Sequence, residues 1–356
     1  MARRLVKRPR PLPQSRGFAI WCGVLTATLA TAWPAAAALT ITPLFLSSIT
    51  GASNAAQVER AINDAIDNIE SLYTNSGDVS IVFTRASGGF LGQSEAADYT
   101  ISYPGYVATL MAVSETEPLN TILSAAVAHL ALGNMPGSGG SVLVTSADAR
   151  VALGFSTATG CFDNTGTFNS SCGQAYDGVV TISNSNPFNY GTTPVAGEYS
   201  AIGAMEHEID EILGGGGQGS VLNEIADGQT SFDDDVGVLD LYRYSAPGVP
   251  SFTTSGSASS YLSVDGGKTD IVCFNQNSAG DMADFCTNNN VQSAFSETGI
   301  VPVYNVYSPE YAMLESIGYN GVPEPASLVL LGSGLAGLTA VRRRRIRGAS
   351  APSGMS

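Results

Sequence analysis

The segment that most constrains this chain covers residues 202–217. Its apolar residues recur every three or four positions: Ile202, Met205, Ile209, Ile212 and Leu213. This spacing predicts a helix that buries one side against a core. The four glycines at 214–217 would end that helix abruptly, because glycine readily adopts the left-handed conformation that closes a helix.

The other side of this helix carries a pattern typical of a metal site. His207 and Glu211 are four residues apart, so their side chains share one face and would hold one metal ion together. Glu208 would stand beside the ion as a general base for water. The layout is that of the H-E-x-x-H zinc helix with glutamate in place of the second histidine. The small residues Gly203 and Ala204, one turn earlier, would leave room for an ion and a substrate.

The alternative is a surface helix whose polar face happens to read His-Glu-x-x-Glu. A catalytic zinc also needs a third protein ligand, and a three-histidine site is excluded because the chain has only His129 and His207. The position used by the longer H-E-x-x-H-x-x-G-x-x-H pattern is Gly217. We therefore expect a downstream carboxylate, with Asp240 as the first choice. Its competitors are Asp227, Asp233, Asp234 and Asp235.

Three further groups are candidates for supporting roles. Tyr242 or Tyr244 would donate to an oxyanion, although a strand tyrosine more often packs in a core. Arg243 would pair with a substrate carboxylate, and the alternative is a buried ion pair with an aspartate. The Asp/Gly loops at 265–270 and 281–284 are of the kind that binds structural Ca²⁺ through oxygens. His129 is expected to be an ordinary helix residue.

The two ends of the chain are targeting segments. Residues 1–38 combine a basic start, an apolar run and the small residues 35–38, which predicts a signal peptide cut by signal peptidase. Residues 322–347 carry Val-Pro-Glu-Pro, an apolar run and an arginine cluster, and 348–356 are expected to be a short disordered tail. The C-terminal segment resembles the PEP-CTERM sorting signal of Gram-negative bacteria. This resemblance implies transient membrane anchoring, processing by an exosortase, and release to the cell surface or extracellular matrix.

Residues 39–321 are left as one large domain, and that domain is strongly acidic. It holds 30 Asp or Glu against five Lys or Arg, a formal net charge of −25. Such a surface excludes nucleic acid and anionic membranes as partners and favours divalent cations.

Cysteine usage agrees with export. Cys22 lies in the signal peptide, and the even number that remains favours disulfides in an oxidising compartment: Cys161, Cys172, Cys273 and Cys286. Four cysteines allow three pairings, and the local pairs Cys161–Cys172 and Cys273–Cys286 would each close a short loop. No C-x-x-C pair is present, which argues against a cysteine zinc site.

Periodicity predicts an α+β domain. Helical spacing covers 58–73, 109–132 (with a second segment from Pro118) and 309–317. Short apolar runs predict strands at 79–83, 141–145, 179–182, 239–244 and 260–264. The chain after Gly217 is rich in loops.

Several strings occur together in this order: Y-D-G-V-V at 176–180, E-H-E-I-D-E-I-L-G at 206–214, L-D-L-Y-R-Y-S-A-P-G at 239–248, S-V-D-G-G at 263–267, G-D at 280–281 and I-G-Y at 317–319. On these strings, residues 61–319 resemble a family of exported bacterial zinc metallopeptidases that often end in PEP-CTERM tails. The chain departs from the family at Gly215 and Phe285, where arginine and tryptophan are usual.

The resemblance implies a zincin-like fold, with a twisted mixed sheet over an active-site helix and a loop-rich C-terminal lobe. It also implies a secreted zinc-dependent endopeptidase that acts on protein or peptide substrates through one catalytic Zn²⁺. The alternative function is a non-catalytic calcium-binding protein of the extracellular matrix or biofilm surface.

Overall fold

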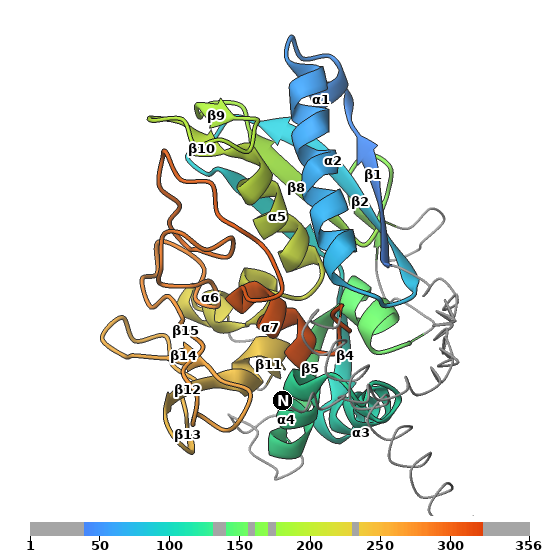
Figure 1. Cartoon of the computed structure of the whole chain (residues 1–356), viewed down its shortest axis with the longest axis vertical. Helices are drawn as coiled ribbons and strands as arrows, with labels where there is room; N and C mark the ends of the chain where they lie inside the picture. The colour runs from blue at the N-terminus through green and yellow to red at the C-terminus, as the bar shows by residue number, and fades with distance from the viewer. Residues whose placement is uncertain (1–38, 131–139, 156–160, 170–175, 230–234, 323–356) are drawn as a thin grey trace, which may run out of the picture. The chain divides into compact units, whose positions relative to one another are not determined.

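The computed structural model describes residues 39–130, 140–155, 161–169, 176–229 and 235–322 (Figure 1). The chain divides into two units, 1–35 and 36–356, and every described residue belongs to the second. The predicted signal peptide, the disordered tail and all but the first residue of the predicted sorting segment lie outside the described residues. Strand β1 (Leu39–Phe45) begins at the first residue after the predicted signal peptide.

The main sheet has four strands in the order β1-β2-β8-β3. Strands β1, β2 (Gly77–Ala86) and β8 (Gly178–Ser183) are parallel to their neighbours, and β3 (Gly92–Ala96) runs antiparallel to β8 at one edge. β2 and β8 are built mainly from buried Val, Ile and Phe, as expected of parallel strands covered on both faces. β3 is the short polar sequence Gly-Gln-Ser-Glu-Ala and is only partly buried, which suits a strand at the edge of a sheet.

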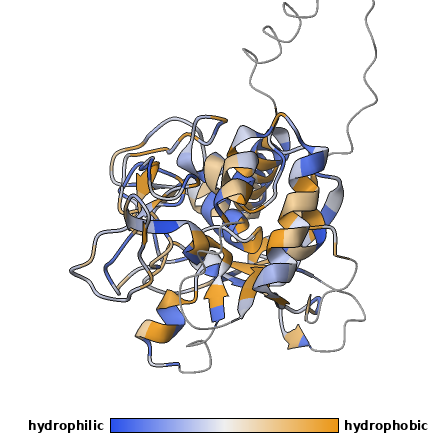
Figure 2. Cartoon of the chain, turned by 90° about the horizontal axis from the view of Figure 1, so that it is seen from below, coloured by the Kyte–Doolittle hydropathy of each residue, from blue (hydrophilic) through white to orange (hydrophobic). Residues whose placement is uncertain are grey.

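Two helices pack together beside this sheet, α2 (Ala55–Leu72) and α5 (Ala201–Ile212) (Figure 1). α2 buries an apolar stripe at helical spacing: Val58, Ala61, Ile62, Ala65, Ile66 and Ile69. α5 also contacts β3 and β8, so it lies between α2 and the antiparallel edge of the sheet. Helices and strands carry both hydrophobic and hydrophilic residues (Figure 2), as expected of elements buried on one side.

Two smaller sheets complete the regular structure. β4 (Asp98–Ser102), β5 (Ser141–Thr145) and β11 (Asp235–Gly237) form one sheet in the order β11-β5-β4, next to α3 (Tyr103–Thr116) and α4 (Thr121–Leu130). The other sheet, β13-β12-β14-β15, lies in the loop-rich C-terminal part, which ends in α7 (Pro309–Ser316). Its strands are β12 (Arg243–Ala246), β13 (Val249–Pro250), β14 (Tyr261–Leu262) and β15 (Val272–Cys273).

The remaining elements are short. They are α1 (Ser47–Thr50), the π-helix η1 (Asp148–Ala152), the β-pairs β6 (Cys161–Phe162) with β7 (Phe168–Asn169) and β9 (Phe188–Asn189) with β10 (Tyr199–Ser200), the 3₁₀ turns η2 (Gly217–Gly219) and η4 (Val238–Tyr242), and α6 (Leu222–Ala226).

The structure contains both helices and several small sheets, which confirms the predicted α+β class. The helices predicted at 58–73, 109–132 and 309–317 and the strands at 79–83, 141–145 and 179–182 are present with small shifts of their ends. The strand predicted at 239–244 is wrong, because Val238–Tyr242 is a 3₁₀ turn and strand β12 begins only at Arg243. The physical reason is Asp240, whose carboxylate Oδ2 accepts the backbone N–H of Gly237 at 2.8 Å and caps the turn.

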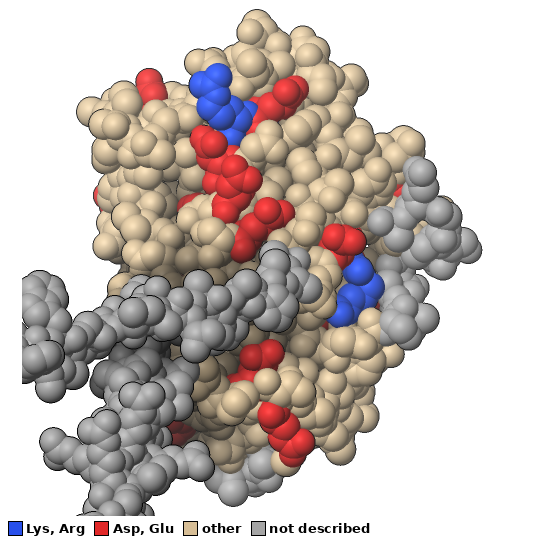
Figure 3. Space-filling model, turned by 45° about the vertical axis from the view of Figure 1, so that its right-hand side comes forward, with Lys and Arg blue, Asp and Glu red and all other residues tan. Residues whose placement is uncertain are grey.

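The described residues include one of the two predicted disulfides and most of the acidic domain. Cys273 and Cys286 form a disulfide, as predicted. The other predicted pair includes Cys172, which lies outside the described residues. Asp and Glu side chains are more widespread than Lys and Arg on the face shown in Figure 3. No helix among the described residues is both long and apolar enough to cross a membrane.

Candidate metal centre

Helix α5 positions the proposed metal-binding side chains. It begins at Ser200, whose hydroxyl accepts the backbone N–H of Gly203 at 3.0 Å. It ends where Gly214 takes a left-handed φ of +99°, so the predicted glycine stop is confirmed. Its polar face is also buried, since Glu208 and Glu211 are only 5% and 4% exposed. The alternative of an ordinary surface helix is therefore excluded.

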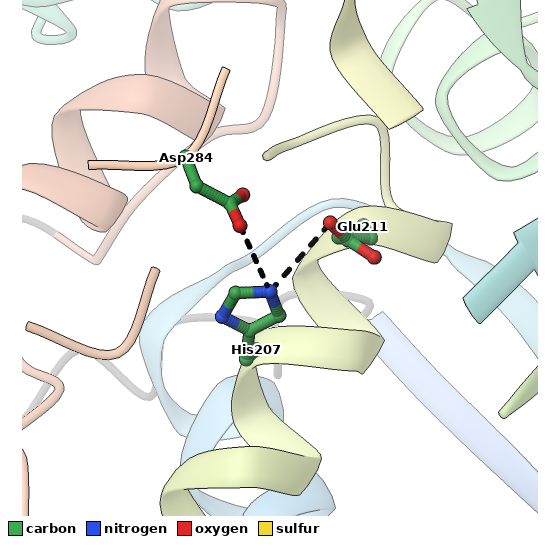
Figure 4. Close-up of side chains that lie close together, drawn as sticks. All are labelled: His207, Glu211 and Asp284. Atoms are coloured by element: carbon green, nitrogen blue, oxygen red, sulfur yellow. Dashed lines mark ion pairs between the residues drawn. The ribbon is translucent and has the colours of Figure 1, made fainter. Parts of the chain in front are cut away.

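Three side chains converge on one point beside α5. His207 and Glu211 come from the helix, and Asp284 comes from the loop that follows β15 (Figure 4). The His207 Nε2 atom lies 3.6 Å from Glu211 Oε1 and 3.4 Å from Asp284 Oδ2, and all three ligand atoms lie within 4.8 Å of one another. A tetrahedral zinc with ligand bonds of ~2.0–2.1 Å places its ligands ~3.4 Å apart. The two distances from His207 Nε2 are close to this spacing, and the three donors are of the types that hold a zinc ion.

Hydrogen bonds orient the His207 ring for metal binding. Its Nδ1 lies 3.0 Å from the carbonyl oxygen of Val291, which favours the tautomer with the proton on Nδ1. The Nε2 lone pair then faces Glu211 and Asp284, and it accepts from Gln292 Nε2 at 3.1 Å, a contact that a bound metal ion would replace. Burial alone would lower the pKa of His207, but Asp284, Glu211 and Glu208 together raise it well above its usual value. A cation at Nε2, either a proton or a metal, is thus strongly favoured.

Glu211 is held by two hydrogen-bond donors. Ser94 of β3 donates its hydroxyl to Oε2 at 2.6 Å, and the backbone N–H of Gly217 donates to Oε1 at 2.9 Å. Burial raises the pKa of Glu211, but hydrogen bonds and the charge of His207 outweigh it and leave the pKa below its usual value. Glu211 is therefore prepared as a carboxylate. Gly217 contributes through its backbone, although its lack of a side chain rules it out as a ligand.

Asp284 is buried and held by its own loop. Gln292 Nε2 donates to Asp284 Oδ1 at 2.8 Å, so the other oxygen, Oδ2, is left to face His207. Burial raises the pKa of the Asp284 carboxyl well above its usual value, and the charge of Glu211 adds to this effect. Buried carboxylates packed this closely repel one another, and either a proton or a bound cation relieves that repulsion.

The loop that carries Asp284 is fixed at both ends. The disulfide Cys273–Cys286 closes it. The buried guanidinium of Arg243 donates to the carbonyl oxygen of Met282 at 2.6 Å and to that of Asn275 at 3.1 Å. The same guanidinium stacks over Phe274 at 4.7 Å from the ring centroid. These contacts hold Asp284 in place before any ligand arrives.

Glu208 lies beneath the edge strand β3. A Cβ atom at Gly92 would come within 2.6 Å of Glu208 Cγ, so only glycine leaves space for this side chain. Among the described residues, Glu208 Oε2 is buried and has no hydrogen-bond partner. Burial first, and then the charge of Glu211, raises the pKa of Glu208 well above its usual value. An unpartnered acid beside the cation site is typical of a group that exchanges protons.

A cleft of about 670 Å³ opens over these residues. Its walls are residues 89–94 around β3, α5, α6 and the loops at 278–284 and 293–296. His207, Glu208, Glu211 and Asp284 all line it. The volume is in the range of small-molecule and peptide-binding sites. Ala204 lines the cleft as predicted, whereas the space at Gly203 is filled by Pro302, whose Cγ lies 2.6 Å from a Cβ placed there.

Asp240, predicted as the third ligand, does not join the cluster; the side chain that lies with His207 and Glu211 is Asp284. Its Oδ1 accepts the Ser220 hydroxyl at 2.6 Å, and its Oδ2 accepts the backbone N–H groups of Val221 and Gly237 at 3.1 and 2.8 Å. With its oxygens used in this way, Asp240 is a structural cap. Of the competitors, Asp227 lines the cleft, Asp235 begins β11, and 233–234 lie outside the described residues.

Tyr242 and Arg243 are also not in the cleft, so their predicted contacts to an oxyanion or substrate are wrong. Tyr242 is fully buried and donates its hydroxyl to the carbonyl oxygen of Ser316 at 2.8 Å. The alternative prediction for Arg243 was a buried ion pair with an aspartate. Arg243 is buried, but its hydrogen-bond partners are carbonyl oxygens. Tyr244 packs against His129, and its hydroxyl contacts His129 Nε2, so both are core residues.

The carboxylates of the two predicted calcium loops have different surroundings. Asp265 accepts from Ser263, Lys268 and Thr269 of its own loop, which makes it a turn cap. The loop at 281–284 instead delivers Asp284 to the zinc-type cluster and Asp281 to the cleft. A carboxylate-bearing loop closed by a predicted disulfide was the sequence signal for Asp284. Nothing in the sequence pointed to Ser94 or Gln292.

Comparison with known proteins gives one match. The PEP-CTERM protein-sorting motif matches residues 321–345. No curated protein and no solved structure matches the chain. The motif is consistent with processing by an exosortase, and it indicates export to the cell envelope surface or the extracellular space of a bacterium.

Proposed function

We propose that residues 39–321 are a zinc-dependent endopeptidase that works outside the cell. The observation that carries this proposal is the convergence of His207, Glu211 and Asp284 next to the unpartnered carboxylate of Glu208, at the floor of one cleft. A binding protein would need the three ligands but would have no use for a buried, unpartnered acid beside them.

His207, Glu211 and Asp284 would hold the zinc ion, which leaves one position of a tetrahedral site open to solvent in the cleft. Zinc bound there would act as a Lewis acid, lowering the pKa of a water to ~7 and polarising the peptide carbonyl. Val291 and Gln292 keep the imidazole and Asp284 aligned, as orienting partners do at other metal sites.

Glu208 would move the proton. Its buried oxygen would accept a proton from the attacking water, and its raised pKa suits a group that retains a proton until the leaving amine takes it. The Gly92 position of β3 lies directly against this carboxylate, so β3 covers one side of Glu208. General acid–base catalysis of this kind contributes ~10²–10⁴-fold to a rate.

The arrangement around the site supports a zincin-like fold as the finer description. A mixed sheet lies over the helix that carries the H-E-x-x-E segment, and the antiparallel strand β3 forms the rim of the cleft. The loop-rich C-terminal part supplies the third ligand, Asp284.

Two carboxylate ligands would make the bound ion a weaker Lewis acid than one held by three histidines, because they donate more negative charge. We therefore expect a slower zinc enzyme, or one that works better with Mn²⁺ or Co²⁺. Activity after reconstitution of metal-free protein with each ion tests this expectation. High activity with zinc, and lower activity with Mn²⁺ and Co²⁺, would contradict it.

The proposal is tested by casein and gelatin hydrolysis with wild type, Glu208→Gln and the matched control Glu206→Gln. Glu206 is also a buried glutamate of α5, but it accepts from Asn68 and does not line the cleft. Hydrolysis should fall at least ~10²-fold in Glu208→Gln and persist in Glu206→Gln. Equal rates in all three proteins would refute the proposal. Calcium binding without hydrolysis would favour the matrix protein instead.

A further inference from the structure

The cleft has a second charged feature besides the metal cluster. Glu224 lies on α6, Asp227 directly follows α6, and Asp281 lies in the loop before Asp284; all three line the cleft. We call these three residues the acidic rim. They are distinct from the three metal-binding side chains and from Glu208.

Asn223 joins the two segments of the acidic rim. Its side-chain nitrogen contacts Asp281 Oδ1, and its side-chain oxygen accepts the backbone N–H of Met282 at 2.9 Å. The helix end that carries Glu224 and Asp227 is therefore fixed relative to the loop that carries Asp281. The rim is a built part of the cleft wall.

The rim reaches the metal cluster. A Cβ atom at Gly217 would lie 2.9 Å from Asp281 Oδ2 and 2.8 Å from Glu211 Oε1, so one methyl group would touch both carboxylates. A substrate held at the metal would thus place a neighbouring side chain against the rim. The cleft volume of about 670 Å³ is large enough for several side chains.

The negative charge of the rim is not compensated by the described residues. A divalent ion at the cluster would be balanced by Glu211 and Asp284, which leaves the three rim carboxylates. No lysine or arginine from the described residues lines the cleft. Arg85 donates to Asn54, Arg150 pairs with Asp177, and Arg243 donates to buried carbonyls.

Two glutamates that line the cleft each have one buried oxygen without a hydrogen-bond partner. Among the described residues, Glu224 Oε2 is buried without a hydrogen-bond partner, and so is Oε2 of Glu208, a side chain more than nine-tenths buried. Burial first, and then the charges of Glu211 and Glu224, raises the pKa of Asp281 to about 6. The charge of His207 acts against this shift at Asp281, and no lysine or arginine among the described residues lines the cleft.

We propose that the acidic rim selects peptide substrates with a lysine or arginine side chain next to the scissile bond. This inference rests on the proposed peptidase function. A basic side chain is long enough to lie along the cleft wall and place its charge among Glu224, Asp227 and Asp281. The same rim repels acidic peptides, so the preference has an attractive and a repulsive part.

The test uses two peptides that are identical except for lysine or glutamine at one position beside the cleaved bond. Wild type should cleave the lysine peptide with a kcat/KM about tenfold higher, and added salt should shrink this ratio. Glu224→Gln should reduce the ratio to about threefold, and Glu224→Lys should bring it below one. The control Asp270→Asn removes an equal charge at an exposed position outside the cleft and should leave the ratio unchanged.

Two results would overturn the inference. The first is equal cleavage of both peptides by wild type, or a ratio that Glu224→Gln and Asp281→Asn leave unchanged. The second is loss of a bound metal ion in Glu224→Gln, measured by elemental analysis, because the rim would then be a cation site.

Binding separates this inference from the peptidase function. If wild type cleaves neither peptide, fluorescence anisotropy of both peptides is measured with wild type and Glu224→Gln. Tighter binding of the lysine peptide that depends on Glu224 would support the rim even though the peptidase proposal fails. Equal binding of the two peptides would overturn the inference on the rim.

Discussion

Replacing Asp284 with asparagine should remove most of the zinc affinity without destabilising the metal-free protein. Asparagine keeps an oxygen that can accept from Gln292 Nε2, as Oδ1 does now at 2.8 Å. It removes a buried negative charge that lies beside Glu211 and whose pKa is raised by burial. The metal-free protein loses like-charge repulsion, and the zinc ion loses one of three ligands.

The size of the effect follows from linkage between binding and folding. At a zinc concentration of ~100 times Kd, binding adds about 2.7 kcal/mol to the free energy of unfolding, or roughly 5–10 °C in Tm. Loss of a direct ligand should weaken binding by more than the ~10–100-fold typical of outer-shell partners. At ~100-fold weaker affinity, the same zinc concentration adds only about 0.4 kcal/mol, roughly 1–2 °C.

The assay is thermal unfolding of chelated protein with and without added zinc, and Asp240→Asn is the control. Asp240 accepts from Ser220, Val221 and Gly237. Its replacement should cost about 3 kcal/mol, or roughly 6–12 °C, in both states, while the zinc-induced shift remains. If Asp284→Asn keeps the full zinc shift and Asp240→Asn loses it, the assignment of ligands is refuted.

Three further outcomes are expected. Arg243→Lys should lower stability by about 2–3 kcal/mol and weaken zinc binding, because an ammonium cannot reach the carbonyls of both Met282 and Asn275; Tm and zinc titration measure this. Cys273→Ser should lower Tm and also weaken zinc binding, since the disulfide with Cys286 closes the loop that carries Asp284; an unchanged zinc affinity would show that the loop holds its shape alone. Burial raises the pKa of Glu206 from 4.5 to about 8, so its protonated form stabilises the fold below pH 4.5 and this stability is lost as pH rises to about 8. Tm measured against pH should therefore fall less over that window in Glu206→Gln than in wild type.

The sequence predicted the helical half of the site because that half is local. His207, Glu208 and Glu211 share one helix, and its apolar period and the glycines after it are visible without any tertiary information. Strands β2 and β8 of the parallel sheet were also predicted, because they contain continuous apolar runs, whereas the edge strand β1 was not predicted. The polar edge strand β3 has no such run, and it was missed.

Asp284, the third side chain of the cluster, was missed for a different reason. Asp284 is separated from Glu211 by a long, loop-rich stretch, and no periodicity relates positions in loops. Asp240 was preferred because it lies in a regular-looking segment, yet its carboxylate caps the turn at Gly237. Which of many aspartates reaches a site depends on tertiary contacts, here the disulfide and the contacts of Arg243 that fix the loop.

The most direct test of the account is X-ray absorption at the zinc edge on residues 39–322 with one equivalent of zinc. The account predicts one imidazole nitrogen and otherwise oxygen ligands at ~2.0–2.2 Å, with this spectrum lost in Asp284→Asn and retained in Asp240→Asn. Sulfur ligands, more than one imidazole, or no tightly bound zinc would contradict the proposed centre of His207, Glu211 and Asp284.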